Sequence, residues 1–562
     1  MSDALYQTFL GFMDELDAFR DRYAMANPGV PLDREDPDTN RLVEALAFFS
    51  ARSHLAAQDR VSALHRRLFE QHFPYVLDPL PAMAVVEIRP RDGLVEATTV
   101  PTGTEMVFST EDEVQAQFRT TRPVELLPLR YLDMMSGERP GGRRRFMLRL
   151  DGTQLPVGAS LATLSIHIRH LGDYGASLFL LDSLRTHIER VSLLSGPRLT
   201  LGDVLDDDQG MTCKVSYGLL DRPGDREPTT VHPIARSRNR LHFPEQDLFI
   251  NVHTPDTPPW RSEPYASDQR QVCICLDVGP GWPTDLRPTT RSFVFFATPV
   301  INLIHEPAEP IRNDGTKVRF RIRPTANPSP RMLHSVRGIY RRTPAGMEPL
   351  KSGLVSAGED AYELERTTHG AAIRCDLIRR APGAFAEPEL LSVDADWFQP
   401  HFADHLSSDV AISPYRRHSR DFTLHLVGRG KRHRTPTSGR EVDLFARALG
   451  VRMRPAMDLD DVRSLLGLVD AVTESHFRDI PNKIQGLQVT EEMPQGRWNS
   501  QGTFTYRFYV TESLSGPGGS VLGYFLATVN TLIDAWVVNA SVQVEAVSTD
   551  QADALTLARR QP

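Results

Sequence analysis

Residues 68–90 read LFEQHFPYVLDPLPAMAVVEIRP, and within them the sequence changes from a helical to a strand-like pattern. Upstream of Pro74, apolar residues recur at the spacing of an amphipathic helix. Downstream, from about Met83, β-branched and apolar residues form short runs separated by turn residues, which is typical of strands. The stretch therefore predicts an α+β protein of several domains, with N-terminal helices, β-rich middle domains and a C-terminal α/β domain.

Two helices are predicted before this change. The first carries an apolar seam whose members follow one another at spacings of 4, 3, 4, 3 and 4: Leu5, Phe9, Phe12, Leu16, Phe19 and Tyr23. This seam can pack on its own domain or join a helical bundle with another chain, and both interpretations stay open. The second helix begins at Asp36-Pro37, an N-cap with proline in the first turn, and ends at Pro74, with a break considered near Gln58-Asp59.

Strand-like runs continue from about residue 80 to residue 440 and indicate two β-rich domains. One helix interrupts them, and Gly196-Pro197 would stop it; its predicted face holds Leu180, Leu181, Leu184, Ile188 and Val191. The predicted boundaries are 1–80 for the helical segment, 81–310 and 311–440 for the β-rich domains, 441–548 for the C-terminal α+β domain and 549–562 for a flexible tail.

The C-terminal domain is predicted to hold a strand, a glycine-rich turn at 515–519, a helix and a second strand. The helix has one strongly apolar face, formed by Val521, Leu522, Phe525, Val529, Leu532, Ile533 and Trp536. Such a face can form the core of the domain or a contact between copies of the chain, and we take it as the candidate for self-association.

Composition narrows the class of protein. The chain has 562 residues and a formal net charge of −8, which favours neither nucleic acid nor an anionic membrane as partner. Its four cysteines, Cys213, Cys273, Cys275 and Cys375, do not resemble a disulfide scaffold, so we expect a reducing, cytoplasmic compartment. We expect neither a signal peptide nor a membrane span, because no apolar run reaches about 18 residues.

Catalytic and metal-binding motifs are scarce. The sequence has no HExxH, GxSxG, Walker-type or GxGxxG motif, so we predict no catalytic residues, no cofactor and no enzyme. Cys273 and Cys275 would share one face of a strand, where buried core thiols are favoured over a metal site. The acidic run 206–208 is expected to be a solvated loop rather than a calcium site. His167 and His170 lie near a strand end, with His167 expected on its polar face and not as a ligand.

Two basic runs, 143–145 and 429–434, could bind phosphate or nucleic acid. Because the chain is acidic overall and no aromatic residues alternate with these cations, a solvated turn or a protein–protein contact is favoured.

A resemblance extends over several separate segments. NRLVEALAFFSAR (40–52), FPYVLDPLPAMAVV (73–86), VPTGT (100–104) and FRT (118–120) are similar to successive motifs of one family. LHFPEQDLFI (241–250), TPVINLI (298–304), AEPI (308–311) and the Gly518-Gly519 turn with the helix to Trp536 continue the match. Together they resemble the TssF family (also called VasA or ImpG) of type VI secretion baseplates. The match is thin from about 340 to 480, where DWFQP (396–400) replaces the family's CTNRDLP.

This resemblance implies a structural wedge subunit that templates assembly of the sheath and tube. The partners it implies are TssG, TssK, TssE, the VgrG spike and a second copy of TssF. It also implies a cytoplasmic location, docked at the inner-membrane-associated secretion apparatus, without membrane insertion or nucleic acid. The seam of the first helix would then join a bundle with TssG, and the C-terminal helix would contact another copy.

Other functions stay open at this stage. The chain could be a wedge or tail subunit of another phage-like contractile particle. It could instead be a β-rich glycan hydrolase, which would need two carboxylates facing each other at about 5–9 Å in a cleft. A sugar-binding module is a further alternative.

Overall fold

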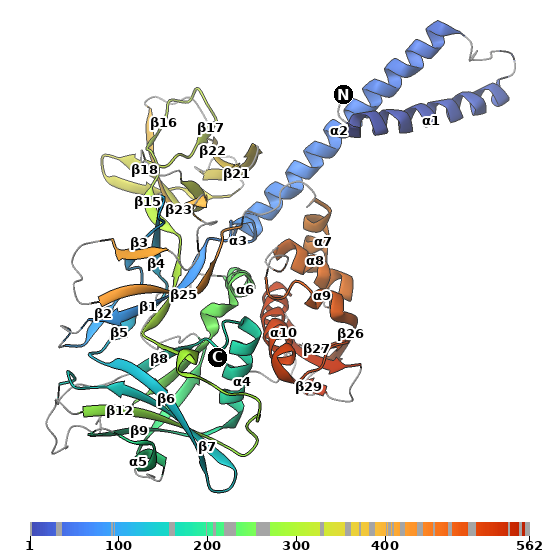
Figure 1. The fold of residues 1–562 in the computed structure, drawn as a ribbon. Coiled ribbons are helices and arrows are strands. Elements are labelled where there is room, and N and C mark those ends of the chain that lie inside the picture. The colour runs from blue at the N-terminus through green and yellow to red at the C-terminus, as the bar shows by residue number, and fades with distance from the viewer. Residues whose placement is uncertain are drawn as a thin grey trace. The chain divides into compact units, whose positions relative to one another are not determined.

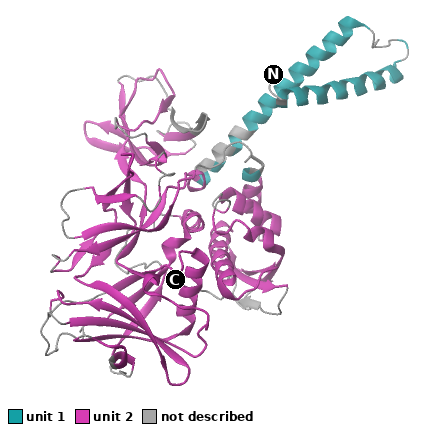
Figure 2. Ribbon diagram, in the orientation of Figure 1, with its two compact units in different colours: residues 1–73, 439–446 teal, residues 74–438, 447–562 magenta. Residues whose placement is uncertain are grey.

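A computed structural model of the chain contains two compact units, drawn in different colours in Figure 2: residues 1–73 with 439–446, and residues 74–438 with 447–562. We refer to them as unit 1 and unit 2. The structure describes residues 3–27, 29, 36–91, 94, 96–156, 163–197, 199–205, 210–218, 232–254, 270–325, 331–353, 361–369, 372–380, 388–400, 402, 406, 410–415, 422–434, 442–452, 454, 456–469, 472, 475–492, 502–537, 540–549 and 554–556.

Unit 1 is built on a hairpin of two long helices, α1 (Asp3–Ala26) and α2 (Pro37–His72) (Figure 1). The start of α2 follows the sequence prediction, because the Asp36 carboxylate accepts hydrogen bonds from the Asp38 amide at 3.1 Å and the Thr39 hydroxyl at 2.5 Å. The break considered near Gln58-Asp59 is wrong, since α2 is continuous there. At the other end of α2, the Phe69 ring stacks on Phe445, from the start of α7 (Val442–Arg452), with 4.6 Å between centroids.

Unit 2 contains two large sheets among its described strands. The first has six strands in the order β24 (Ala411–Pro414), β3 (Glu105–Ser109), β4 (Gln115–Thr120), β14 (Ala297–Ile301), β1 (Met83–Pro90) and β25 (Phe422–Lys431). The second has eight, in the order β13 (Phe293–Phe295), β8 (Thr163–Ile168), β11 (Phe249–His253), β10 (Met211–Tyr217), β9 (Ile188–Pro197), β12 (Arg270–Val278), β7 (Arg143–Asp151) and β6 (Arg130–Arg139).

Three smaller sheets complete the β-rich part. A five-stranded sheet joins β15 (Ile304–Pro307), β23 (Glu389–Phe398), β18 (Met332–Thr343) and β19 (Gly346–Pro349), with β16 (Ile311–Asn313) also on β23. A four-stranded sheet runs β17 (Arg319–Arg321), β22 (Ala372–Arg380), β21 (Ala361–His369) and β20 (Lys351–Ser352). A two-stranded ribbon pairs β2 (Thr98–Val100) with β5 (Val124–Leu126).

The C-terminal part of unit 2 is a layer of helices on a sheet. Its strands are β26 (Ile484–Glu492), β27 (Gly502–Val510), β28 (Ala540–Ser548) and β29 (Ala554–Thr556), and β27 pairs with β28 in parallel. β29 lies within the segment that the sequence predicts to be a tail. The remaining helices of unit 2 are α3 (Pro74–Leu77), α4 (Tyr174–His187), α5 (Leu201–Leu205), α6 (Pro233–His242), η1 (Pro244–Asp247), η4 (Thr290–Ser292), α8 (Leu459–Val469), α9 (Ile480–Lys483) and α10 (Gly516–Trp536).

These elements confirm the predicted α+β class with several domains. One predicted helix is partly wrong. Residues Tyr174–His187 are helical as α4, but Ile188 and Val191 belong to strand β9, which runs to Pro197 between β10 and β12. Strand pairing on both sides satisfies the backbone of this segment, which outweighs its weak helical spacing. The acidic run 206–208 lies outside the described residues.

Candidate interaction surfaces

The apolar seam predicted on the first helix lies against α2. Its members Leu5, Phe9, Phe12, Leu16 and Tyr23 are half-buried, and the Phe12 ring meets the His54 ring of α2 edge-on at 5.7 Å. Next to the seam, Arg20 is buried and donates to the Asn40 side chain of α2 at 3.0 Å. The seam therefore holds the hairpin together, and of its members only Phe19 is largely exposed, at 53%.

A second apolar surface lies on α2, and the sequence analysis missed it. Ala47 and Ala51 are fully buried in unit 1, whereas Leu42, Leu46 and Phe49 are exposed by 72%, 55% and 62%. Their spacing of 4 and 3 residues places these three on one face of the helix. We call Leu42, Leu46 and Phe49 the outer stripe. The sequence carries this signal as LxxxLxxF within NRLVEALAFFSAR.

Large apolar side chains such as those of the outer stripe are seldom exposed side by side on a protein surface. Val61 and Leu64 add to them farther along α2, at 52% and 53% exposure. A contiguous apolar surface on a helix marks an interaction site more often than chance, because leaving it in water costs free energy. The outer stripe is thus the best candidate for a partner contact in unit 1.

The apolar face of α10 is used inside unit 2. Leu522, Phe525, Val529, Leu532, Ile533 and Trp536 are all at most 1% exposed, and only Val521 is half-buried. The Trp536 indole donates to the Ala448 carbonyl at 3.3 Å, and the Phe525 ring lies 5.6 Å from that of Phe477. A second copy could reach these side chains only if the C-terminal layer opened, so self-association through this face stays a prediction.

The first basic run is partly a buried structural element and not a turn. It begins β7, where Arg145 is fully buried and donates from Nε and Nη2 to the two Asp277 oxygens at 2.6 and 2.8 Å. Arg143 is exposed and pairs with Glu189 at 3.0 Å. The second run ends β25, and the backbone of Arg434 pairs with that of Leu80. The expected solvated turn is therefore wrong for Arg145, because Asp277 of β12 and the Val204 carbonyl of α5 bind its guanidinium in the interior.

The histidine and cysteine predictions differ in outcome. His167 is buried, so the prediction that it lies on a polar face of the strand is wrong. Its Nε2 donates to the Glu245 carbonyl of η1 at 3.2 Å. Burial lowers the pKa of His167 to about 4. Cys273 and Cys275 are fully buried on one face of β12 with their sulfurs 3.8 Å apart, packed with Met147 and Leu194, which confirms the core prediction. In the described part of the chain, no three His, Cys, Asp or Glu residues are arranged to hold a metal ion.

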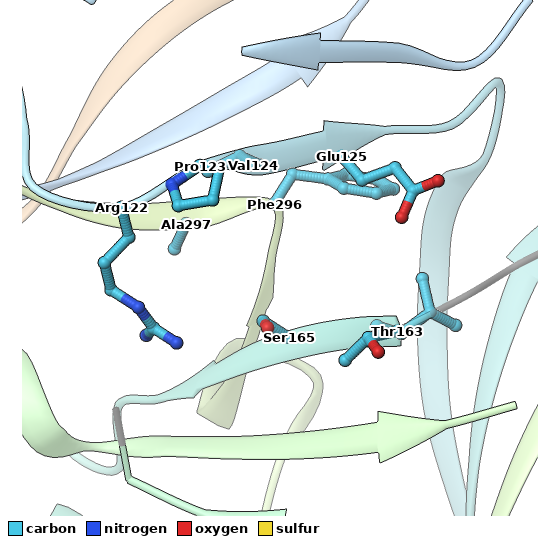
Figure 3. A pocket seen from close by; sticks show the side chains of 9 residues that line it. Arg122, Pro123, Val124, Glu125, Thr163, Ser165, Phe296 and Ala297 are labelled. Carbon is cyan, nitrogen blue, oxygen red and sulfur yellow. The ribbon is translucent and has the colours of Figure 1, made fainter. Parts of the chain in front are cut away.

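A small pocket lies beside β5 and β8 and is shown in Figure 3. Arg122, Glu125, Thr163, Ser165 and Phe296 line it, and its volume is about 20 Å³. That is room for about one water molecule. It holds a single carboxylate, whereas glycoside hydrolysis requires a pair. This pocket therefore does not support the glycan-acting alternative. No helix in the described part of the chain is long and apolar enough to cross a membrane.

Comparison with known families decides the identity. The model of the type VI secretion system family TssF matches residues 29–363. The chain belongs to the TssF family. All the segments quoted above from 40–52 to 308–311 lie inside the match, whereas the Gly518-Gly519 turn and α10 lie beyond it.

One curated relative and two solved structures are similar to this chain. The type VI secretion system component TssF1 of Pseudomonas aeruginosa is 30% identical over 99 residues, which are 17% of this chain and 16% of that protein. A cryo-electron microscopy structure of the TssK-TssF-TssG baseplate subcomplex contains a chain that superposes with a TM-score of 0.69 at 15% identity, over 93% of this chain and 99% of that one. A structure of the type VI baseplate complex gives a TM-score of 0.58 at 17% identity, over 98% of both chains. At such identities the superpositions establish a shared fold.

Proposed function

We propose that this TssF-family chain is a structural wedge component of a type VI secretion baseplate and has no enzymatic activity. In this role it assembles with TssG, TssK and TssE around the VgrG spike, in more than one copy, and templates the sheath and tube. It works in the cytoplasm, docked at the inner-membrane-associated apparatus. Membership of the TssF family and a fold shared over almost its full length with chains of baseplate complexes support this proposal.

The observation that carries the proposal is the outer stripe of unit 1. A wedge subunit must hold neighbours at fixed geometry, and helical bundles do this through apolar faces that the free subunit leaves exposed. Leu42, Leu46 and Phe49 form such a face, and Phe19 of α1 is the member of the seam that remains open to a partner. TssG is the partner that we assign to this surface.

Co-expression with the TssG of the same system tests the assignment. We expect wild-type chain and TssG to co-purify as a complex with two copies of this chain and one of TssG. Leu46→Asp with Phe49→Asp should abolish co-purification, because two desolvated carboxylates would lie in the interface. Helicity, measured by circular dichroism, should be unchanged, since both side chains are exposed in the free hairpin.

The matched control is Arg41→Asp with Arg52→Asp, which places two carboxylates at exposed positions about 90° around α2 from the outer stripe and should retain TssG. The variant Phe12→Asp with Phe19→Asp distinguishes the role of the α1 seam from that of the outer stripe. Because Phe12 packs on His54, this variant should loosen the hairpin itself and lower its helicity. Retention of TssG by the Leu46/Phe49 variant would contradict the assignment.

A further inference from the structure

One face of the five-stranded sheet of unit 2 lies in the core, and the opposite face is open to solvent near Leu390, whereas Asp396 farther along that face is buried. Ile311, Ile339 and Leu391 lie on the buried face and belong to one hydrophobic cluster. On the opposite face, four strands place one residue each in a single line: β16 contributes Arg312, β23 Leu390, β18 Arg342 and β19 Met347. Directly opposed residues of antiparallel strands point to the same side of a sheet, so we call these four residues the cross-strand row.

The row alternates cation, apolar, cation, apolar and is open to solvent. Leu390 and Met347 are 36% and 57% exposed, and both arginines are exposed. Among the described residues, no carboxylate forms an ion pair with the guanidinium of Arg312 or Arg342. The nearby carboxylates of Glu348 and Glu389 form ion pairs with Arg341 instead. The pKa of Asp314 is lowered mainly by hydrogen bonds from Thr316, and the charge of Arg312 is only a minor cause.

The spacing of the row indicates the shape of its partner. Neighbouring strands lie about 4.8 Å apart, so three intervals span roughly 14 Å. A helix presents one residue per turn of about 5.4 Å, or roughly 16 Å over three turns, whereas every second residue of a strand would span about 20 Å. Long arginine side chains can absorb a mismatch of about 2 Å but not one of about 6 Å. The row therefore fits a helix that crosses the strands and carries acid, apolar, acid, apolar in successive turns.

Helix α1 of this chain has that pattern on the face away from the seam. Asp14, Ala18, Asp21 and Met25 follow one another at spacings of 4, 3 and 4, and all four are exposed, Met25 by 84%. We infer that α1 of one copy docks through these four residues on the cross-strand row of a second copy. The inference rests on the proposed function only in that the assembly holds several copies.

Such a contact is head-to-tail, because the row and the helix are different surfaces. Each copy in a series keeps one row and one helix for its neighbours, which suits repetition around a central spike. It also leaves the outer stripe, which lies on α2, free for TssG. Exposed ion pairs contribute about 0.2–1 kcal/mol each and are screened by salt, so the contact is weak and salt-sensitive.

A charge-swap experiment on the full chain alone tests the contact. The row variant is Arg312→Glu with Arg342→Glu, and the helix variant is Asp14→Arg with Asp21→Arg. Sedimentation velocity in low-salt buffer should show association of the wild type that rises with concentration and falls with added salt. Each variant should associate at least about tenfold more weakly than the wild type, since like charges then face each other. An equimolar mixture of the two variants should restore association, because the acidic row of one meets the basic helix of the other.

Arg321→Glu with Arg323→Glu is the matched control, with the same charge change at other exposed arginines, and should associate like the wild type. A wild type that stays monomeric at every concentration, a variant that associates normally, or a mixture that does not recover would overturn the inference. Co-purification of both variants with TssG reports separately on the proposed function, because neither variant changes the outer stripe.

Discussion

Arg145 and Asp277 form a buried ion pair in which each guanidinium nitrogen has a partner. Besides its two bonds to Asp277, Arg145 donates from Nη1 to the Val204 carbonyl at 2.6 Å, and Arg139 approaches Asp277 at 3.5 Å. Removing one partner of such a pair leaves the other charged in the interior, which typically costs about 3–5 kcal/mol. The pair therefore acts as a fixed connection between β7 and β12.

We expect Arg145→Met to lower the free energy of unfolding of unit 2 by about 3–5 kcal/mol. Arg145→Met combined with Asp277→Leu should recover much of that loss, because neither charge of the buried pair remains and Arg139 is partly exposed to water. Urea unfolding of both variants measures the difference. Arg143→Met is the control from the same basic run, and it should cost at most about 1 kcal/mol because Arg143 and Glu189 are exposed. Equal losses for Arg143→Met and Arg145→Met would contradict this account.

The different roles of Arg143 and Arg145 could not be predicted from the sequence. The two side chains lie on the same face of a strand, in a run of three identical residues. What separates them is Asp277, 132 residues away, together with strand pairing that covers one end of β7 and leaves the other open. Cys273 and Cys275 could be predicted, because a free thiol in a strongly apolar strand is most often buried whatever the topology.

At the scale of elements, two glycines of α10 are chemically alike but lie in different surroundings. A Cβ atom at Gly519 would lie 2.2 Å from the Leu514 carbonyl oxygen, which is backbone and cannot rotate away. A Cβ at Gly523, one turn later, would meet no atom within 4 Å. The first glycine is required by the close approach of the chain that enters the helix, whereas the second only lowers helix propensity.

Gly519→Ala and Gly523→Ala should therefore change stability in opposite directions. We expect Gly519→Ala to destabilise unit 2 by about 2 kcal/mol or more, within the range of a strained backbone site. Gly523→Ala should stabilise it by up to about 1 kcal/mol through helix propensity. Thermal melts of the two variants beside the wild type measure both signs. A shift of the same sign and size in both would show that the approach of Leu514 does not constrain the helix.

Long helices with regularly spaced apolar residues could be predicted from the sequence. Strands whose partners lie far away in the chain could not. α1, α2 and α10 follow from apolar spacing and from caps such as Asp36-Pro37. The sequence predicts that β9 continues helix α4, because Ile188 and Val191 fit a helical face as well as a strand. Its neighbours β10 and β12 lie downstream in the chain, so nothing local in the sequence could separate the two interpretations.

At the scale of the whole molecule, sequence motifs identify the family but not the order of the strands. β14, which holds the TPVI of the TPVINLI motif, lies between β4 and β1, and β1 in turn pairs with β25. These pairings join parts of the chain hundreds of residues apart. The fold of unit 2 also buries two histidines, His242 of α6 and His167 of β8, so the stability of unit 2 should depend on pH.

His242 and His167 are each at most 3% exposed in unit 2. Burial lowers the pKa of His242 to about 3, with the positive charge of Lys431 as a further cause, and lowers that of His167 to about 4. Each donates its Nε2 proton to a carbonyl, of Pro81 and of Glu245, and the Nδ1 atom of His167 has no partner in the described structure. A second proton would thus add a buried charge that the surroundings do not solvate.

Because these pKa values lie below the roughly 6.5 of an unfolded histidine, the unfolded chain binds more protons in acid. The stability that neutral His242 and His167 provide is full above about pH 6.5 and is lost as the pH falls toward their folded pKa values. At pH 5 each histidine should lower the free energy of unfolding by about 2 kcal/mol relative to pH 7.5.

We expect the melting temperature of unit 2 to fall over this range, and His242→Gln with His167→Gln to make the fall shallower. His72→Gln, an exposed position, is the control and should melt with the wild-type dependence on pH. A double variant with the wild-type slope would assign the acid sensitivity to other groups, since carboxylates titrate equally in all three proteins and cancel in the comparison.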